Sequence, residues 1–130
     1  MGSEMKAADY IIVGGGSAGC VMAARLSENG NHKVLLIEAG PSDRRFDIDV
    51  PVGYARTYFD SRVNWMFNSA PVPSLGDRVV YYPRGKVLGG SGSINAMVFA
   101  RGQAEDFEDW EKAGNQGWGW RDVLPFYKKM

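Results

Sequence analysis

Glycine is the feature that most limits what this chain can fold into. It accounts for 17 of the 130 residues, and two clusters, at 14–19 and 85–92, hold much of it. The sequence has no collagen-like repeat, so glycine at this frequency indicates a backbone that turns tightly or approaches another group closely. We therefore look for a binding site at these two clusters.

The first cluster lies within a strand–turn–helix–strand pattern. The apolar runs 10–13 and 34–37 predict two buried parallel strands, and residues 20–26 between them predict a helix. The apolar side of that helix is expected to hold four residues: Ala18, Val21, Met22 and Leu26. The pattern is a βαβ unit with a right-handed crossover, so the predicted fold class is α/β.

Residues 14–19 fit the motif G-x-G-x-x-G, with a strand before it and a helix after it. Gly14 permits the tight turn, Gly16 lets the backbone approach a pyrophosphate, and Gly19 lets helix and strand pack closely. The N–H groups at the start of the helix face the phosphates. Glu38 ends the second strand, where a carboxylate would accept hydrogen bonds from the adenosine ribose hydroxyls. The same carboxylate would repel a 2′-phosphate, so NADP is disfavoured. The unit alone does not distinguish NAD from FAD, and a glycine turn without a ligand is the alternative.

Residues 43–75 predict mostly loop with short local structure, and residues 78–82 predict a strand or extended segment. For residues 94–99 helix and extended chain stay open. A helix is expected over 105–112, ended by Gly114. Another begins at Asp122, where a proline is tolerated only in the first turn.

The second cluster, within residues 84–95, combines glycines with the hydroxyls of Ser91 and Ser93 and with basic residues upstream. Such a segment suits a second close approach to the same anionic cofactor. A flexible surface loop is the alternative.

This second segment resembles the first signature of the glucose–methanol–choline (GMC) oxidoreductase family. The matching positions are Gly85, Lys86, Leu88, Gly89, Gly90, Ser91, Gly92, Ile94, Asn95, Phe99, Gly102 and Glu108. Residues 9–20, 38–40, Trp118 and 123–125 are also similar to the family, so the resemblance covers nearly the whole chain. Gln116 departs from it, since relatives often carry proline there.

The resemblance implies a Rossmann-like FAD-binding domain that is incomplete in this chain and has extended loop segments. Residues 1–8 are expected to be disordered or tag-derived. Residues 9–130 are expected to be the amino-terminal part of a discontinuous FAD-binding domain, without the substrate domain and the catalytic segment. The helix that begins near residue 122 has an apolar side without a partner, so we expect a fragment. The remaining carboxy-terminal part would be a separate partner chain.

The resemblance also implies which residues contact FAD. The pyrophosphate would meet Gly14, Gly16, Ser17 and Gly19, and the ribose Glu38. The flavin's phosphate and ribityl side would meet Gly89, Gly90 and Ser91. The isoalloxazine would lie against Asn95, Ala96 and Val98. The expected set of cofactor contacts is completed by Ala18, Ala39 and Met97. Some relatives attach FAD through a histidine where this chain has Ile94, so non-covalent FAD is expected.

The implied activity is oxidation of a primary or secondary alcohol to the carbonyl by hydride transfer to flavin N5. A histidine in a carboxy-terminal segment acts as the base in the family, so no catalytic residue is expected in this chain. His32, the only histidine, is expected to be an exposed turn residue. Two alternatives stay open: a GMC-fold lyase or photodecarboxylase, and an NAD-dependent Rossmann dehydrogenase.

Four further side chains have an open or modest role. Cys20 is expected to be a small residue packed under the cofactor, Trp65 to lie in packing or near the adenine or the substrate entrance, and Arg84 and Lys86 to be structural or solvated as readily as cofactor-binding.

Composition limits the partners and the location. With 15 basic and 15 acidic residues, the formal net charge is zero, which argues against nucleic-acid binding driven by bulk charge. No apolar run approaches the ~20 residues that span a bilayer. We expect no metal site. The single cysteine excludes an internal disulfide and favours an intracellular, cytoplasmic setting.

Overall fold

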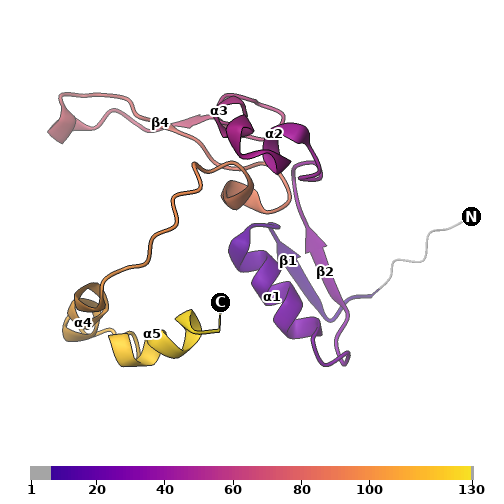
Figure 1. The fold of residues 1–130 in the computed structure, drawn as a ribbon, viewed down its shortest axis with the longest axis vertical. Coiled ribbons are helices and arrows are strands. Elements are labelled where there is room, and N and C mark those ends of the chain that lie inside the picture. The colour runs from indigo at the N-terminus through magenta and orange to yellow at the C-terminus, as the bar shows by residue number, and fades with distance from the viewer. Residues whose placement is uncertain (1–6, 130) are drawn as a thin grey trace, which may run out of the picture. The chain divides into compact units, whose positions relative to one another are not determined.

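The chain divides into two compact units, Met1–Met97 and Val98–Met130. They are seen here in a computed structural model that describes residues 7–129 (Figure 1). Most of the segment expected to be disordered or tag-derived, 1–8, therefore lies outside the described residues.

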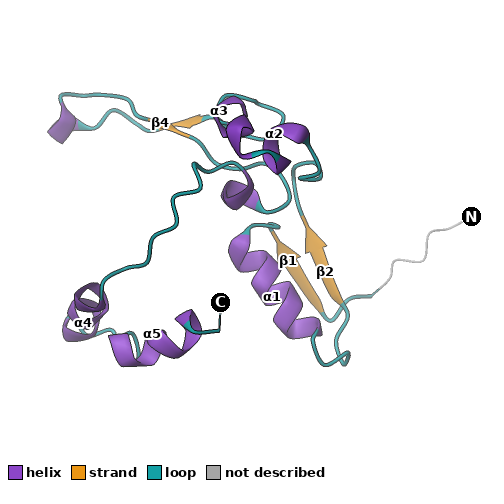
Figure 2. Cartoon of the chain, in the orientation of Figure 1, coloured by secondary structure: helices purple, strands orange, loops and turns teal. Residues whose placement is uncertain are grey.

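The first unit begins with the βαβ pattern. Strand β1 (Tyr10–Val13), helix α1 (Ser17–Ser27) and strand β2 (Val34–Ile37) follow one another (Figure 2). The two strands are parallel and pair in the register Tyr10↔Val34 to Val13↔Ile37. The predicted α/β class is confirmed.

The apolar side predicted for α1 was largely wrong. Val21 and Met22 are 60% and 55% exposed, and Ala18 is exposed as well. The side that packs consists of the partly buried Gly19, Cys20, Ala23 and Leu26. Glycine decides this, because a Cβ at Gly19 would collide with the carbonyl oxygen of Gly14 and lie 3.4 Å from Cγ2 of Ile12. The helix therefore approaches β1 along its smallest residues.

The expectation of two buried strands holds for one face of the sheet only. Ile12, on the face toward α1, is 8% exposed. Four aliphatic side chains lie on the opposite face of the sheet and are 46–83% exposed: Ile11, Val13, Leu35 and Ile37. We call these four the bare sheet face. Parallel sheets are ordinarily covered on both faces.

Short elements follow, as expected from the fading periodicity. They are α2 (Phe46–Asp49), α3 (Tyr54–Thr57), the two-residue strands β3 (Phe67–Asn68) and β4 (Tyr81–Tyr82), and 3-10 turns at Pro51–Gly53 and Pro73–Leu75. The strands β3 and β4 pair antiparallel. The core of this region consists of Val63, Val87 and Ile94, all at most 4% exposed, with Ile48 packed against it.

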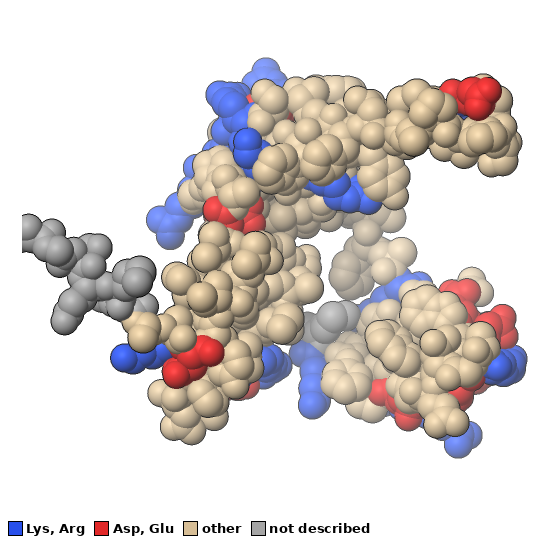
Figure 3. Space-filling model, turned by 180° about the vertical axis from the view of Figure 1, so that it is seen from behind, with Lys and Arg blue, Asp and Glu red and all other residues tan. Residues whose placement is uncertain are grey.

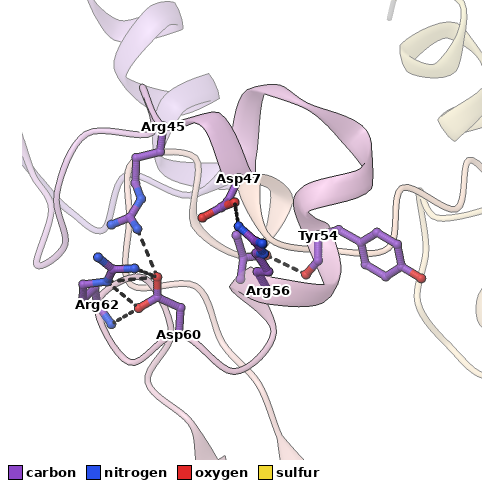
Figure 4. A network of polar contacts seen from close by, with 7 residues as sticks. Arg45, Asp47, Tyr54, Arg56, Asp60 and Arg62 are labelled. Carbon is purple, nitrogen blue, oxygen red and sulfur yellow. Dashed lines mark hydrogen bonds and ion pairs between the residues drawn. The ribbon is translucent and has the colours of Figure 1, made fainter.

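Ion pairs close the segment that holds α2 and α3 (Figure 4). The carboxylate of Asp60 lies 3.0 Å from Arg45 and 2.7 Å from Arg62, and its side chain is 14% exposed. The Arg62 hydrogen bonds, together with the charge of Arg45, hold the pKa of Asp60 below its ordinary value. A second pair joins Arg56 to Asp47 at 3.5 Å. The five charged side chains tie residues 45–47 to residues 56–62.

The second unit pairs two helices, α4 (Ala104–Lys112) and α5 (Trp120–Tyr127). Gly114, with φ +99°, follows the end of α4 as predicted. The ring of Phe107, which is 8% exposed, lies 5.5 Å from Trp110 and 5.9 Å from Tyr127. Both contacts are edge-to-face, and the one with Tyr127 joins α4 to α5.

The expectation for the proline in α5 was wrong. The helix begins at Trp120, two residues before the predicted start, which places Pro125 beyond the first turn. Pro125 has no N–H to donate to the carbonyl of Arg121, so one helical hydrogen bond is missing. Aromatic packing of Trp120 and Tyr127 on Phe107 favours the helix in spite of that loss.

Candidate functional site

The two glycine clusters lie against each other. The N–H of Gly89 donates to the carbonyl oxygen of Gly15 at 2.7 Å, and Gly16 and Gly89 form an isolated parallel bridge. A Cβ on Gly90 would lie 2.9 Å from Cα of Gly16, which is closer than real side chains approach. Segments far apart in the sequence thus form one surface, and they meet backbone to backbone.

The second cluster is anchored in the first unit. Its 3-10 turn η3 (Gly90–Ser93) begins after Gly89, which has φ +87°. The buried residues Val87 and Ile94 hold its two ends in the core. The alternative of a flexible surface loop therefore does not describe it.

The hydroxyls of this cluster bind its own backbone. Ser91 Oγ accepts a hydrogen bond from the N–H of Gly85 at 3.0 Å, and Ser93 Oγ donates to the carbonyl of Leu88 at 2.8 Å. Their first task is thus to shape the turn. Ser91 is also exposed, so its hydroxyl has room for a further partner.

Glu38 lies between the two clusters. Its Oε2 accepts from the N–H of Gly15 at 2.7 Å, and its Oε1 accepts from the N–H of Gly40 at 2.9 Å. Each carboxylate oxygen has a second lone pair, so the group still has capacity for ribose hydroxyls. Ala39 beside it is exposed.

The start of α1 suits an anion. Gly14 turns with φ +101°, and no acidic residue occupies the first turn of the helix. Within residues 7–129 no side chain caps this end either, so its N–H groups and the positive end of the helix dipole are available to a phosphate. Ser17 and Ala18 are exposed there. A pyrophosphate fits this end of the helix, because the glycines allow close approach, the N–H groups can donate to it, and the first turn carries no carboxylate.

Residues 94–99, left open between helix and extended chain, are neither a helix nor a strand. Asn95 Oδ1 accepts a hydrogen bond from the N–H of Met97 at 2.7 Å, and Met97 has the left-handed φ of +56°. Asn95, Ala96 and Met97 are exposed at the end of the first unit, and Val98 begins the second.

His32 is placed as expected, and the packing of Cys20 under the cofactor stays a prediction. His32 is exposed in the turn before β2, with its ring edge-on to Tyr10 at 5.1 Å. The Cys20 thiol is partly buried beneath the glycine turn and donates to the carbonyl of Gly15 at 3.2 Å.

The basic residues upstream of the second cluster contact aromatic rings. Lys86 Nζ lies 4.9 Å from the ring centre of Trp65, which stacks on Phe67. The guanidinium of Arg84 lies 4.0 Å from the ring centre of Tyr82. Of the two roles left open for Lys86 and Arg84, these cation–π contacts favour the structural one.

Residues 40–41 belong to the site, although the sequence indicated only a turn there. The N–H of Leu88 donates to the carbonyl of Pro41 at 3.0 Å. A Cβ on Gly40 would collide with the carbonyl of Lys86. The signal was present in the Gly-Pro pair, but the segment that packs on it lies far along the chain.

Within residues 7–129, no helix is long and apolar enough to cross a membrane. The same residues contain no group of three or more His, Cys, Asp or Glu side chains placed to hold a metal ion.

A comparison with known families agrees with the geometry of the two clusters. The sequence pattern of the GMC oxidoreductase family matches residues 8–130. The chain belongs to the GMC oxidoreductase family. The GMC chain corresponds to the amino-terminal domain of that family, whose members use FAD.

Curated relatives share about half of its residues. The GMC chain is 50% identical over 122 residues to an alcohol dehydrogenase [acceptor] of Pseudomonas putida and 44% identical over 127 residues to mitochondrial choline dehydrogenase of Mus musculus. These matches cover 94% and 92% of this chain. The chain spans only 22% and 21% of the length of those two relatives.

Solved structures show the same fold. Pyridoxine 4-oxidase from Mesorbium loti superimposes with a TM-score of 0.81 at 38% identity, over 92% of this chain and 24% of that one. A variant of formate oxidase from Aspergillus oryzae gives 0.83 at 32% identity, over 96% of this chain and 22% of that one. The GMC chain therefore has the fold of the matching portion of those enzymes.

Proposed function

We propose that this chain forms most of the FAD cradle of an enzyme that oxidises a primary or secondary alcohol to the carbonyl. The hydrogen bond between Gly89 and Gly15 carries the proposal, since it joins the second glycine cluster to a dinucleotide-binding turn. An NAD-dependent Rossmann dehydrogenase has no need of that second segment. Names of relatives, an alcohol dehydrogenase and a choline dehydrogenase, favour a CH–OH donor.

The residues of the chain would hold the cofactor in three places. The start of α1, with Gly14, Gly16, Ser17, Ala18 and Gly19, would bind the pyrophosphate, and Glu38 with Ala39 would bind the adenosine ribose. The flavin's phosphate and ribityl side would lie along Gly89, Gly90 and Ser91. The isoalloxazine would lie against Asn95, Ala96, Met97 and Val98. FAD bound there would supply the hydride acceptor.

The base that takes the hydroxyl proton would come from outside this chain. His32, the only histidine, is exposed before β2, whereas the glycine turn follows the carboxyl end of β1. Because the strands are parallel, these positions lie at opposite ends of the sheet.

We propose non-covalent FAD, because Ile94 is 4% exposed and has no nucleophilic atom. Denaturing the holoprotein should release all flavin into the supernatant. Flavin that stays with the precipitated polypeptide would contradict this.

We also propose that residues 9–130 are part of a discontinuous FAD-binding domain, completed by the remaining carboxy-terminal part as a separate chain. The bare sheet face supports a covering partner, and Figure 3 shows much of the surface over the β1–β2 region free of charged residues. Intact-mass analysis of the purified protein should find a second polypeptide; this chain alone would contradict the proposal. A single cysteine favours a cytoplasmic enzyme, which cell fractionation would test.

The absorption spectrum tests the main proposal. The purified protein, or the protein after addition of FAD, should show the bands of bound oxidised flavin, and an alcohol should bleach them under anaerobic conditions. A colourless preparation that FAD does not restore would refute the cradle. Flavin that stays oxidised with every alcohol would refute the alcohol oxidation but leave the cradle standing.

A further inference from the structure

We infer that Glu38 has a second task beyond the ribose: it is a positioning residue that clasps the second glycine cluster onto the first. This inference deepens the proposed function and rests on it for the identity of the cofactor. Its structural content concerns hydrogen bonds of this chain alone.

The clasp begins at the two oxygens of one carboxylate. Oε2 receives the N–H of Gly15 at 2.7 Å and Oε1 receives the N–H of Gly40 at 2.9 Å. Both bonds are partly buried and have a charged acceptor, which makes them stronger than bonds between neutral groups. One side chain thus fixes two backbone segments that follow different strands.

Both segments are the places where residues 86–90 dock. Gly15 accepts the N–H of Gly89 at 2.7 Å through its carbonyl. Beyond Gly40, the carbonyl of Pro41 accepts the N–H of Leu88 at 3.0 Å. The second cluster is therefore hydrogen-bonded to the two backbone segments that Glu38 holds. Among the hydrogen bonds of residues 7–129, no other side chain bonds to both segments.

The packing supports the same role. A Cβ on Gly15 would lie 3.0 Å from Cδ1 of Leu88 and 3.3 Å from Oε2 of Glu38, so Leu88 and the carboxylate enclose that glycine. The N–H that donates to Glu38 and the carbonyl that accepts from Gly89 both flank the Cα of Gly15, so fixing the one restrains the orientation of the other. Loss of the carboxylate should therefore loosen Gly89 as well as Gly15.

The experiment compares Glu38→Gln with a matched control, Glu28→Gln. The glutamine keeps the size of the side chain, but one head-group atom becomes a donor, so only one of the two N–H bonds can be accepted. Glu28 is exposed, and in the part of the chain that the structure describes its side chain pairs with Arg25 alone. Hydrogen exchange of the flavin-free protein is measured at Gly15, Gly40 and Gly89, together with the affinities for FAD and for ADP.

In Glu38→Gln we expect exchange to accelerate about tenfold at those glycines and much less in α1. Affinity for FAD should fall about tenfold further than affinity for ADP, because ADP contains the ribose but does not reach the second cluster. The control should change neither. If Glu38 serves the ribose alone, FAD and ADP weaken by the same factor and exchange at Gly89 is unchanged, which overturns the inference.

Acceleration of equal size throughout β1 and α1 would also overturn the inference, since the carboxylate would then support the whole fold. If Glu38→Gln does not fold, the same measurements are made on Glu38→Asp, because its shorter side chain keeps the charge but does not span both N–H groups. A wild-type protein that binds ADP but no FAD would refute the proposed function, whereas the exchange data would still decide the clasp.

Discussion

At the scale of single residues, the site depends on glycines that touch backbone. Gly90 has φ +60° and faces Cα of Gly16, whereas Gly76 has φ +66° with nothing within 4 Å of an added Cβ. The two positions share the same left-handed conformation and differ only in the neighbour.

Gly90→Ala should therefore cost more than Gly76→Ala. The left-handed conformation alone costs an alanine about 1 kcal/mol, and a forced overlap adds about 1–3 kcal/mol. We expect urea unfolding to show the larger loss for Gly90→Ala, accompanied by weaker FAD binding. Equal losses for the two variants, or unchanged FAD affinity in Gly90→Ala, would show that the close approach to Gly16 is unimportant.

The roles of Gly14, Gly16 and Gly19 could be predicted because each is defined by immediate neighbours: a strand before and a helix after. What Gly90 touches could not be predicted, since its partner lies in another segment. The same applies to Glu38, whose spacing indicated the ribose but not its bonds to Gly15 and Gly40.

At the scale of elements, a charged network holds the short helices α2 and α3 in place. Asp60 accepts from Arg62 and pairs with Arg45, and its pKa is lowered in the folded chain. A carboxyl with a lowered folded pKa stabilises the fold at a pH above its unfolded pKa, about 3.9, and the contribution is lost as pH falls through the folded value.

Asp60→Asn should destabilise the protein by about 1 kcal/mol at neutral pH, a modest figure because Arg62 is largely exposed. The difference from wild type should shrink below pH ~4 and vanish once Asp60 is protonated. Thermal unfolding across this range measures it. Asp109→Asn, which removes an exposed ion pair with Lys112, is the control and should change stability little. A difference that is constant with pH would contradict the assignment.

Periodicity predicted that α1, α4 and both strands exist, because that signal is local. It failed on which side of α1 packs, since Gly19 brings the helix to β1 along small residues that carry little apolar signal. It also failed on Pro125, because the start of α5 is set by Trp120 and its aromatic neighbours. The β3–β4 hairpin was indicated only on one side, by residues 78–82.

At the scale of the whole molecule, the bare sheet face is the main unsatisfied feature of the first unit. Val13 is 83% exposed in this chain, whereas Ile12 next to it is 8% exposed. A substitution at Val13 should therefore affect association with a covering partner, whereas one at Ile12 should affect the stability of the chain itself.

Val13→Thr should leave the unfolding free energy of this chain nearly unchanged. Under the proposal that a separate chain completes the domain, it should weaken association with that chain by about 1 kcal/mol. Ile12→Val, its control inside the packed face, should cost about 1 kcal/mol in the chain itself. Denaturation and a binding titration separate the two. Undiminished association in Val13→Thr would show that the partner does not cover this face.

The sequence predicted that both clusters approach one ligand, but it contained no signal for how they meet. They meet through the backbone bond from Gly89 to Gly15, and the bond from Leu88 to Pro41 docks the second cluster beside it. These are backbone groups, which are the same in every residue. For that reason FAD could be predicted only from the resemblance to the family, whereas composition and periodicity predicted only the α/β class.

The close approach of Gly16 and Gly90 has a consequence for how such a site can evolve. A bulky side chain in a core can be accommodated by trimming its neighbour, but here the neighbour is main chain, which no substitution removes. The same holds for Gly19 against Gly14, and for Gly40 against Lys86. A second substitution therefore cannot compensate for a side chain added at these glycines. Sequence changes should accumulate in the residues around them instead.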